Sequence, residues 1–189
     1  MLTQNSMIET LKDFVQRLDD LGIQYMITGS FAMHAYATGR LTYDIDAVIE
    51  LSASDAAGFE SRFLPDYYVD QNSINLAVEN GSMFNIINQK NGVKIDCIVK
   101  RATGFESDKF QRRRKSKIDG ISFWVISKED LILSKFEWAK DSHSEKQFLD
   151  IRNLLESGVE EKELFEQIER RHLTEVWTEF EKWKIRIKR

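Results

Sequence analysis

Cysteine and proline are nearly absent from the 189-residue chain, which contains one of each. The single cysteine, Cys97, excludes a disulfide within the chain, as is usual for proteins of the reducing cytoplasm. No segment reaches the roughly 18 consecutive apolar residues that a membrane-spanning helix needs. Residues 1–7 lack the basic region and apolar stretch of a secretory signal. We therefore expect a cytoplasmic protein with no membrane association.

A strong charge of one sign is also missing. The formal net charge is −4, which argues against a protein that coats nucleic acid. Hydrophobic residues make up 42% of the chain and charged residues 31%, so it can bury an ordinary core and is not disordered. Two basic segments, 112–117 and 182–189, depart from the acidic balance. Each is either a solvated segment or a local contact to phosphate.

The hydrophobic pattern predicts an α/β (α+β) fold with a helical end. Over residues 1–126 we expect helices at 6–21, 31–37, 54–63 and 73–79, and strands at 23–27, 43–51, 84–88, 93–99 and 121–126. Ser6 with Glu9 resembles a capping box, and Asn91-Gly92 favours a hairpin turn. Beyond a cap pair at Ser127 and Asp130, the pattern is helical throughout. We predict an α/β core over 1–126 and a C-terminal helical region over 127–189 packed against it.

Two aspartates mark the strand predicted at 43–51. Asp44 and Asp46 are two residues apart, so their side chains leave the same face, with Cα atoms roughly 6.5 to 7 Å apart. Two bare carboxylates on one strand repel each other, and the neighbouring residues Ile45 and Ala47 offer no basic partner. Carboxylate oxygens are the ligands that Mg²⁺ prefers. The pair alone is a common pattern, but it fits a metal site.

Two further features make chance less plausible. Gly29-Ser30 follows a predicted strand and precedes a predicted helix, where backbone N–H groups, a hydroxyl and a helix N-terminus suit a phosphate. Asp96 lies within the apolar strand predicted at 93–99, where a charge is costly unless it is paired or metal-bound. If that strand lies beside the strand at 43–51, Asp96 completes a cluster of three carboxylates.

At these residues the sequence resembles the nucleotidyltransferase superfamily of DNA polymerase beta-like fold. The family signature is a Gly-Ser or Gly-Gly turn, an Asp-x-Asp pair after a short helix, and a third Asp on a later strand; here these are 29–30, 44–46 and 94–98. The string at 40–46 is similar to the stand-alone bacterial branch that includes abortive-infection and toxin–antitoxin nucleotidyltransferases. The resemblance covers about residues 7–155 and implies a mixed sheet flanked by helices, followed by a helical region.

The resemblance implies a metal-dependent active site. Asp44, Asp46 and Asp96 would be the catalytic residues and the metal ligands, holding two Mg²⁺ ions, for which Mn²⁺ can substitute. Asp96 would ligate the ion nearer the attacking hydroxyl and help to remove its proton. The ions would bridge the phosphates of a nucleoside triphosphate such as ATP.

The resemblance also implies nucleotide-binding residues. Gly29 and Ser30 would hold the outer phosphates. Lys135 would neutralise the triphosphate if its helix folds over the cleft, with Asp150 positioning it. Arg40 precedes the aspartate strand and either approaches phosphate or balances the acidic cluster.

We therefore expect an enzyme that transfers a nucleoside monophosphate to an acceptor hydroxyl on tRNA, on a protein or on a small molecule. A toxin–antitoxin or phage-defence role with a cognate partner protein fits the branch resemblance. The alternative is a non-catalytic, antitoxin-like binding module that retains the fold. A metal-dependent phosphodiesterase or nuclease could use the same carboxylates, but the Gly-Ser turn ahead of them disfavours it.

Overall fold

The computed structural model describes residues 3–37, 39, 42–101, 104–142 and 144–187. The chain divides into two compact units. The first contains Met1–Ala35 and Leu41–Ile126, and the second contains Tyr36–Arg40 and Ser127–Arg189. Arg40, which the sequence marks as a candidate nucleotide-binding residue, lies outside the described residues.

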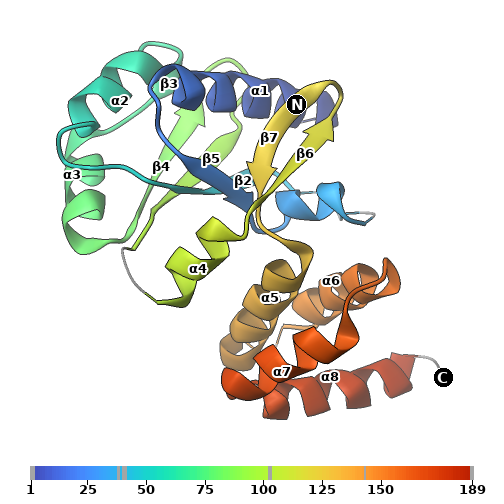
Figure 1. Ribbon diagram of the computed structural model, residues 1–189. Coiled ribbons are helices and arrows are strands. Elements are labelled where there is room, and N and C mark those ends of the chain that lie inside the picture. The colour runs from blue at the N-terminus through green and yellow to red at the C-terminus, as the bar shows by residue number, and fades with distance from the viewer. Residues whose placement is uncertain (1–2, 38, 40–41, 102–103, 143, 188–189) are drawn as a thin grey trace. The chain divides into compact units, whose positions relative to one another are not determined.

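A seven-stranded mixed sheet forms the centre of the first unit (Figure 1). Its strands are β1 (Tyr25–Thr28), β2 (Asp44–Ile49), β3 (Tyr67–Tyr68), β4 (Met83–Asn88), β5 (Lys94–Val99), β6 (Arg114–Ile118) and β7 (Ile121–Val125). Their order is β3-β4-β5-β2-β1-β7-β6. Strand β2 is parallel to β5 and β1 is parallel to β7, whereas the other pairs are antiparallel. The expected hairpin is present as β4 and β5.

The helices of this unit are α1 (Gln4–Asp20), the 3₁₀ helix η1 (Phe31–Ala35), α2 (Ala56–Phe63), α3 (Gln71–Asn80) and α4 (Phe105–Gln111). Helix α1 begins earlier than its sequence pattern predicts. Thr3 is its N-cap, because the Thr3 hydroxyl accepts a hydrogen bond from the backbone N–H of Ser6 at 3.2 Å. The expected capping box at Ser6 and Glu9 is therefore wrong, since Ser6 already lies inside the helix.

The two faces of the sheet differ sharply at β2 and β5. Alternate residues share a face, which places Ile45, Ala47 and Ile49 on one side together with their partners Ile95, Cys97 and Val99. All six are buried. Phe84 of β4 pairs with Cys97 on this face, and Phe59 of α2 meets the Phe84 ring edge-on at 5.5 Å. The helix-covered core thus takes one face, and the other carries Asp44, Asp46, Lys94 and Asp96 beside the apolar pair Val48 and Ile98.

The second unit consists of α5 (Lys128–Ser142), α6 (Glu145–Glu156), α7 (Glu161–Arg170) and α8 (Thr174–Ile187). Contacting aromatic rings fill its interior: Phe136, Phe148, Trp177, Phe180 and Trp183. The predicted cap of α5 is confirmed, because the hydroxyl of Ser127 donates to Asp130 at 2.7 Å and accepts its backbone N–H at 3.2 Å. Within the described part of the chain, no helix is long and apolar enough to span a membrane.

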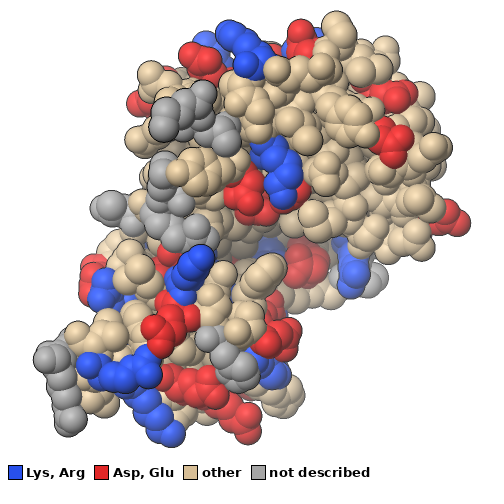
Figure 2. Space-filling view, turned by 180° about the vertical axis from the view of Figure 1, so that it is seen from behind, with Lys and Arg blue, Asp and Glu red and all other residues tan. Residues whose placement is uncertain are grey.

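Charges of both signs are mixed over the surface. On the face shown in Figure 2, Lys and Arg side chains lie next to Asp and Glu side chains. This mixture agrees with the nearly balanced composition of 27 basic and 31 acidic residues.

Candidate active site

The three predicted catalytic aspartates lie on neighbouring strands. Strand β5 runs parallel to β2, with Asp46 opposite Asp96 and Asp44 opposite Lys94. Paired strands lie about 4.8 Å apart, and residues in register share a face. The expected neighbourhood of the two strands is confirmed, and all three carboxylates leave the face that the core does not use. We therefore treat this face as the candidate active site.

The turn after β1 closes directly onto Asp46. Thr28, at the end of β1, pairs with Asp46, and Gly29 follows with a φ of 64°. A Cβ atom placed on Gly29 would lie 1.9 Å from Oδ2 of Asp46. Both the left-handed backbone and the missing side chain are therefore needed here. The predicted phosphate turn and the predicted metal ligand are brought into contact.

Ser30 occupies the next position of this turn. Its carbonyl accepts the N–H of Met33 at 3.3 Å, which begins the 3₁₀ helix η1. The sequence predicts a longer helix at 31–37, whereas η1 ends at Ala35. Gly29 and Ser30 thus stand next to Asp46 on a tight turn rather than at the end of a long helix.

Asp44 is oriented by a hydroxyl. Thr42 is 7% exposed, and its Oγ1 donates to Oδ1 of Asp44 at 2.6 Å. A hydrogen bond to a carboxylate is short and relatively strong because the acceptor carries charge. Thr42 therefore holds the Asp44 side chain in one orientation.

Asp96 is the most buried of the three aspartates, with 7% of its surface exposed. Its Oδ2 accepts a hydrogen bond from the Lys94 ammonium at 2.7 Å. Its Oδ1 is buried and has no hydrogen-bond partner among the described residues. A buried carboxylate oxygen without a partner is costly, and such groups are rare in folded proteins. Asp96 thus retains an oxygen that a ligand can satisfy.

Lys94 provides a positive charge within the site. The hydrogen bond to Asp96 raises the pKa of Lys94, and burial acts in the opposite direction. The negative charges of Asp96, Asp44 and Asp46 raise this pKa further. The ammonium therefore interacts with all three carboxylates and not only with the one that it contacts.

The residue types at this site are ones that bind a divalent metal ion. Carboxylate oxygens suit Mg²⁺, and the unsatisfied Oδ1 of Asp96 is a ready ligand. As the described side chains stand, however, no three His, Cys, Asp or Glu residues converge as a preformed metal site. One oxygen of Asp96 is instead occupied by Lys94.

Lys135 and Asp150 form an ion pair in the second unit. Nζ of Lys135 donates to Oδ2 of Asp150 at 2.7 Å and to Oε1 of Gln147 at 3.4 Å. The side chains of Lys135 and Asp150 are 5% and 1% exposed. The contact between them agrees with the expectation that Asp150 positions Lys135. A role of Lys135 toward a nucleotide stays a prediction.

Sequence reasoning missed two residues of this site, Lys94 and Thr42. The signal for Lys94 was present, because the two-residue spacing that joins Asp44 to Asp46 also joins Lys94 to Asp96. Thr42 precedes the strand, where no periodicity indicates the direction of its hydroxyl.

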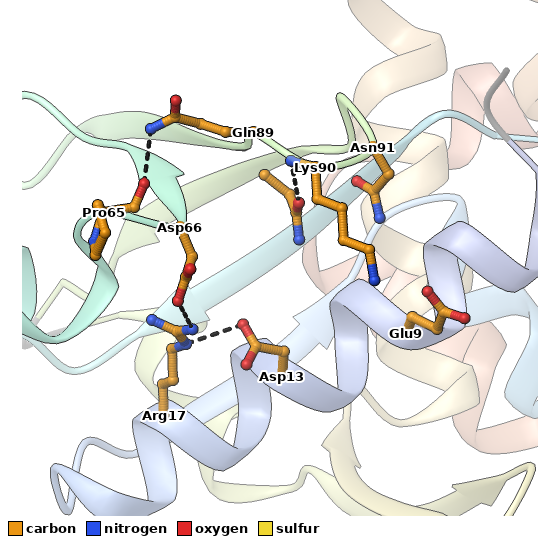
Figure 3. Close-up of a pocket in the computed structure, with 9 residues that line it drawn as sticks. Glu9, Asp13, Arg17, Pro65, Asp66, Gln89, Lys90 and Asn91 are labelled. Atoms are coloured by element: carbon orange, nitrogen blue, oxygen red, sulfur yellow. Dashed lines mark hydrogen bonds and ion pairs between the residues drawn. The ribbon is translucent and has the colours of Figure 1, made fainter.

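A cavity of about 440 Å³ lies elsewhere in the first unit (Figure 3). Residues of α1 and of the β4–β5 turn contribute to its lining, and none of the three aspartates does. Arg17 donates to Asp13 at 2.9 Å and to Asp66 at 2.5 Å in its wall. These charges satisfy one another, so we assign no ligand to the cavity.

Comparison with known proteins identifies the fold. No protein-family model and no curated protein sequence matches the chain. Among solved structures, the antibiotic-resistance factor ANT(2'')-Ia matches with a TM-score of 0.55 and 13% identity, over 98% of this chain and 97% of that one. The lincosamide antibiotic adenylyltransferase LnuA, bound to lincomycin, gives 0.52 and 15%, over 81% and 96%. TM1012 from Thermotoga maritima gives 0.53 and 16%, over 77% and 92%.

These identities are low, so the likeness concerns the arrangement of the backbone. It agrees with the mixed sheet and flanking helices expected from the sequence. The chain has a nucleotidyltransferase-like fold, similar to the folds of ANT(2'')-Ia and LnuA.

Proposed function

We propose that this protein is a divalent-metal-dependent nucleotidyltransferase that transfers a nucleoside monophosphate from a nucleoside triphosphate to an acceptor hydroxyl. One observation carries the proposal: the carboxylates of Asp44, Asp46 and Asp96 share one face of the sheet, and the Gly29 turn contacts one of them. A phosphate-binding turn beside paired carboxylates is the arrangement that phosphoryl transfer needs.

Each residue of the site has its own role in the proposed reaction. Asp44 and Asp46, together with Asp96, would hold the cations, and the turn at Gly29 and Ser30 would offer donors to the outer phosphates. Bound divalent ions supply positive charge to the entering and leaving oxygens. The acceptor oxygen forms a bond to the α-phosphorus as the bond to pyrophosphate breaks. Asp96 would also bind a cation through Oδ1, which has no hydrogen-bond partner among the described residues, and its carboxylate would accept the proton of the acceptor hydroxyl.

The structural neighbours favour ATP as donor and a small hydroxylated molecule as acceptor. ANT(2'')-Ia has been solved in complex with adenylyl-2''-tobramycin, and LnuA is a lincosamide antibiotic adenylyltransferase. RNA, including tRNA, is a second acceptor class in this proposal. The exposed cations of β6 (Arg114, Lys115 and Lys117) could contact its phosphates. A protein acceptor and a toxin–antitoxin or phage-defence setting in the cytoplasm, with a cognate partner, rest on the resemblance of residues 40–46.

The test is transfer of label from each of four α-³²P nucleoside triphosphates, with Mg²⁺ or Mn²⁺. The acceptors are total RNA, total protein, and a panel of aminoglycosides and lincosamides. We expect label in one acceptor class with the wild type and none with Asp44→Asn/Asp46→Asn. Asp119→Asn is the matched control, because it makes the same isosteric change at an exposed turn whose φ of 47° suits asparagine.

Two results would count against the proposal. If the double variant transferred label as well as the wild type, the aspartates would not be the active site. If neither protein labelled any acceptor while both bound nucleotide, the non-catalytic binding module would be the better description.

A further inference from the structure

The ion pair between Lys94 and Asp96 lies inside the candidate site. The two side chains are two residues apart on β5, and the Lys94 ammonium contacts Oδ2 of Asp96 at 2.7 Å. Lys94 stands opposite Asp44 in the register of β2 and β5. Its side chain is 42% exposed, whereas that of Asp96 is 10% exposed. The cation can therefore reach water without moving the strand, and the carboxylate cannot.

The ammonium and a metal ion would share the carboxylate of Asp96, because Lys94 contacts Oδ2 and Oδ1 has no hydrogen-bond partner among the described residues. Mg²⁺ binds carboxylate oxygens at about 2.1 Å, and an ammonium within hydrogen-bond distance of the same carboxylate would lie only a few ångströms from the metal. Two positive charges at that separation repel strongly in a partly buried site. A metal that ligates Asp96 therefore disfavours the contact between Lys94 and this carboxylate, and the exposed ammonium can move into water.

The charge balance shows what Lys94 does before a metal arrives. Three carboxylates on one face repel one another, and the Lys94 ammonium offsets part of that repulsion through its contact with Asp96. A divalent cation in its place would offset more of the repulsion, because it carries twice the charge.

From these contacts we infer that Lys94 is a displaceable internal cation. It stabilises Asp96 in the metal-free protein, weakens metal binding in the absence of nucleotide, and releases Asp96 when the metal enters. This inference rests on the proposed function, since it assigns a metal to the same carboxylates. Lys94 is a positioning residue on this account, because it acts through Asp96.

The experiment measures Mn²⁺ binding without nucleotide, from the electron paramagnetic resonance signal of free Mn²⁺. The proteins are the wild type, Lys94→Met, Lys94→Gln, Lys94→Arg and Asp96→Asn. We expect Lys94→Met and Lys94→Gln to bind Mn²⁺ about tenfold more tightly or better, the scale on which one nearby like charge acts. Lys94→Arg keeps the charge and should bind like the wild type, and Asp96→Asn should bind more weakly.

Lys90→Met is the matched control, because Lys90 is exposed at the β4–β5 turn and not on the carboxylate face. It should leave Mn²⁺ affinity unchanged. The inference is overturned if both neutral variants bind Mn²⁺ as the wild type does or more weakly, or if no protein in the series binds Mn²⁺. Having two neutral variants keeps the test decisive if one of them fails to fold.

The outcome is separable from that of the proposed function. If the wild type transfers nucleotide but the neutral variants bind Mn²⁺ no more tightly, only the inference fails. If no transfer occurs with any acceptor but the neutral variants do bind Mn²⁺ more tightly, the internal cation stands and the enzymatic proposal fails.

Discussion

Two lysine–aspartate pairs in this protein have the same length and different surroundings. Lys94 contacts Asp96 at 2.7 Å on the open face of the sheet, and Lys135 contacts Asp150 at 2.7 Å within the helical unit. The lysine side chain is 42% exposed in the first pair and 5% exposed in the second. From the distance alone, the two pairs would be expected to contribute equally to stability. The difference in water access makes one pair exchangeable and the other structural.

The physical reason is desolvation. An ion pair whose cation is hydrated contributes little to the free energy of folding. The ammonium interacts with water nearly as favourably as with the carboxylate, so breaking the pair costs little. A fully buried pair has no such alternative, so removing one partner leaves an uncompensated charge in the interior. The predictions below test this contrast, beginning with the change expected to have the largest effect.

Lys135→Met should lower the free energy of unfolding by about 3–5 kcal/mol, because Asp150 would remain buried without its cation. Lys94→Met should lower it by about 1 kcal/mol or less. Urea unfolding followed by circular dichroism measures both changes. Equal losses of stability in the two variants would show that the difference in burial does not change what the ion pairs contribute.

The pair in the helical unit allows a second comparison. Lys135→Met/Asp150→Leu removes both charges and should recover much of the stability that Lys135→Met loses. If the folded double variant also transfers nucleotide at the wild-type rate, Lys135 has no role at the triphosphate. If transfer is lost while stability returns, the nucleotide-binding prediction for Lys135 gains support.

Gly29→Ala tests how far the carboxylate face tolerates change. Its Cβ would overlap Asp46, and its φ of 64° is unfavourable for alanine, so we expect a loss of about 1–3 kcal/mol and of nucleotide transfer. Gly92→Ala is the control, because Gly92 has a φ of 76° but no atom within 4 Å of the added Cβ. It should lose about 1 kcal/mol and keep transfer. Equal effects at both glycines would contradict the proposed contact.

The sequence predicted the parts of the fold that carry strong alternation. Strands β2 and β5 combine apolar residues on one face with Asp44, Asp46 and Asp96 on the other, so the pattern predicted both strands, whereas their pairing was a condition for the carboxylate cluster. The short strand β3 and helix α4 have no comparable pattern and were missed. Tertiary pairing, not local preference, determines them.

Strand β6 shows most clearly what the sequence pattern could not predict. Its sequence, Arg114–Ile118, is mostly basic and was interpreted as a solvated segment or a phosphate contact. Among the described residues it is an edge strand paired with β7, and the side chains of Arg114, Lys115 and Lys117 are exposed. Lys94 was missed for a related reason: its two-residue spacing from Asp96 is visible in the sequence, but only the register of β2 and β5 shows which other acids it faces.

Thr42→Val should have a smaller effect on stability than Lys135→Met or Gly29→Ala. It removes the hydroxyl that donates to Asp44, a contribution of about 0.5–1.5 kcal/mol. Because a carboxylate without this bond is less well oriented, Mn²⁺ affinity should fall in the same titration in which Lys94→Met raises it. A rise in affinity for Thr42→Val would show that the hydroxyl competes with the metal.

The smallest effect is expected at Cys97, which follows Asp96 but faces the buried side of β5. Burial, together with the charge of Asp96, raises the pKa of the Cys97 thiol above its ordinary value. Because the folded state disfavours the thiolate, Cys97 should resist thiol reagents between about pH 7 and pH 9, and labelling should follow opening of the sheet. Lys94→Met should change this labelling rate by no more than about fivefold, the factor that matches a loss of about 1 kcal/mol, since its ion pair lies on the opposite face and is partly hydrated. Rapid labelling in Lys94→Met would mean that the pair stabilises the sheet itself, and the contrast with Lys135 would then lose its basis.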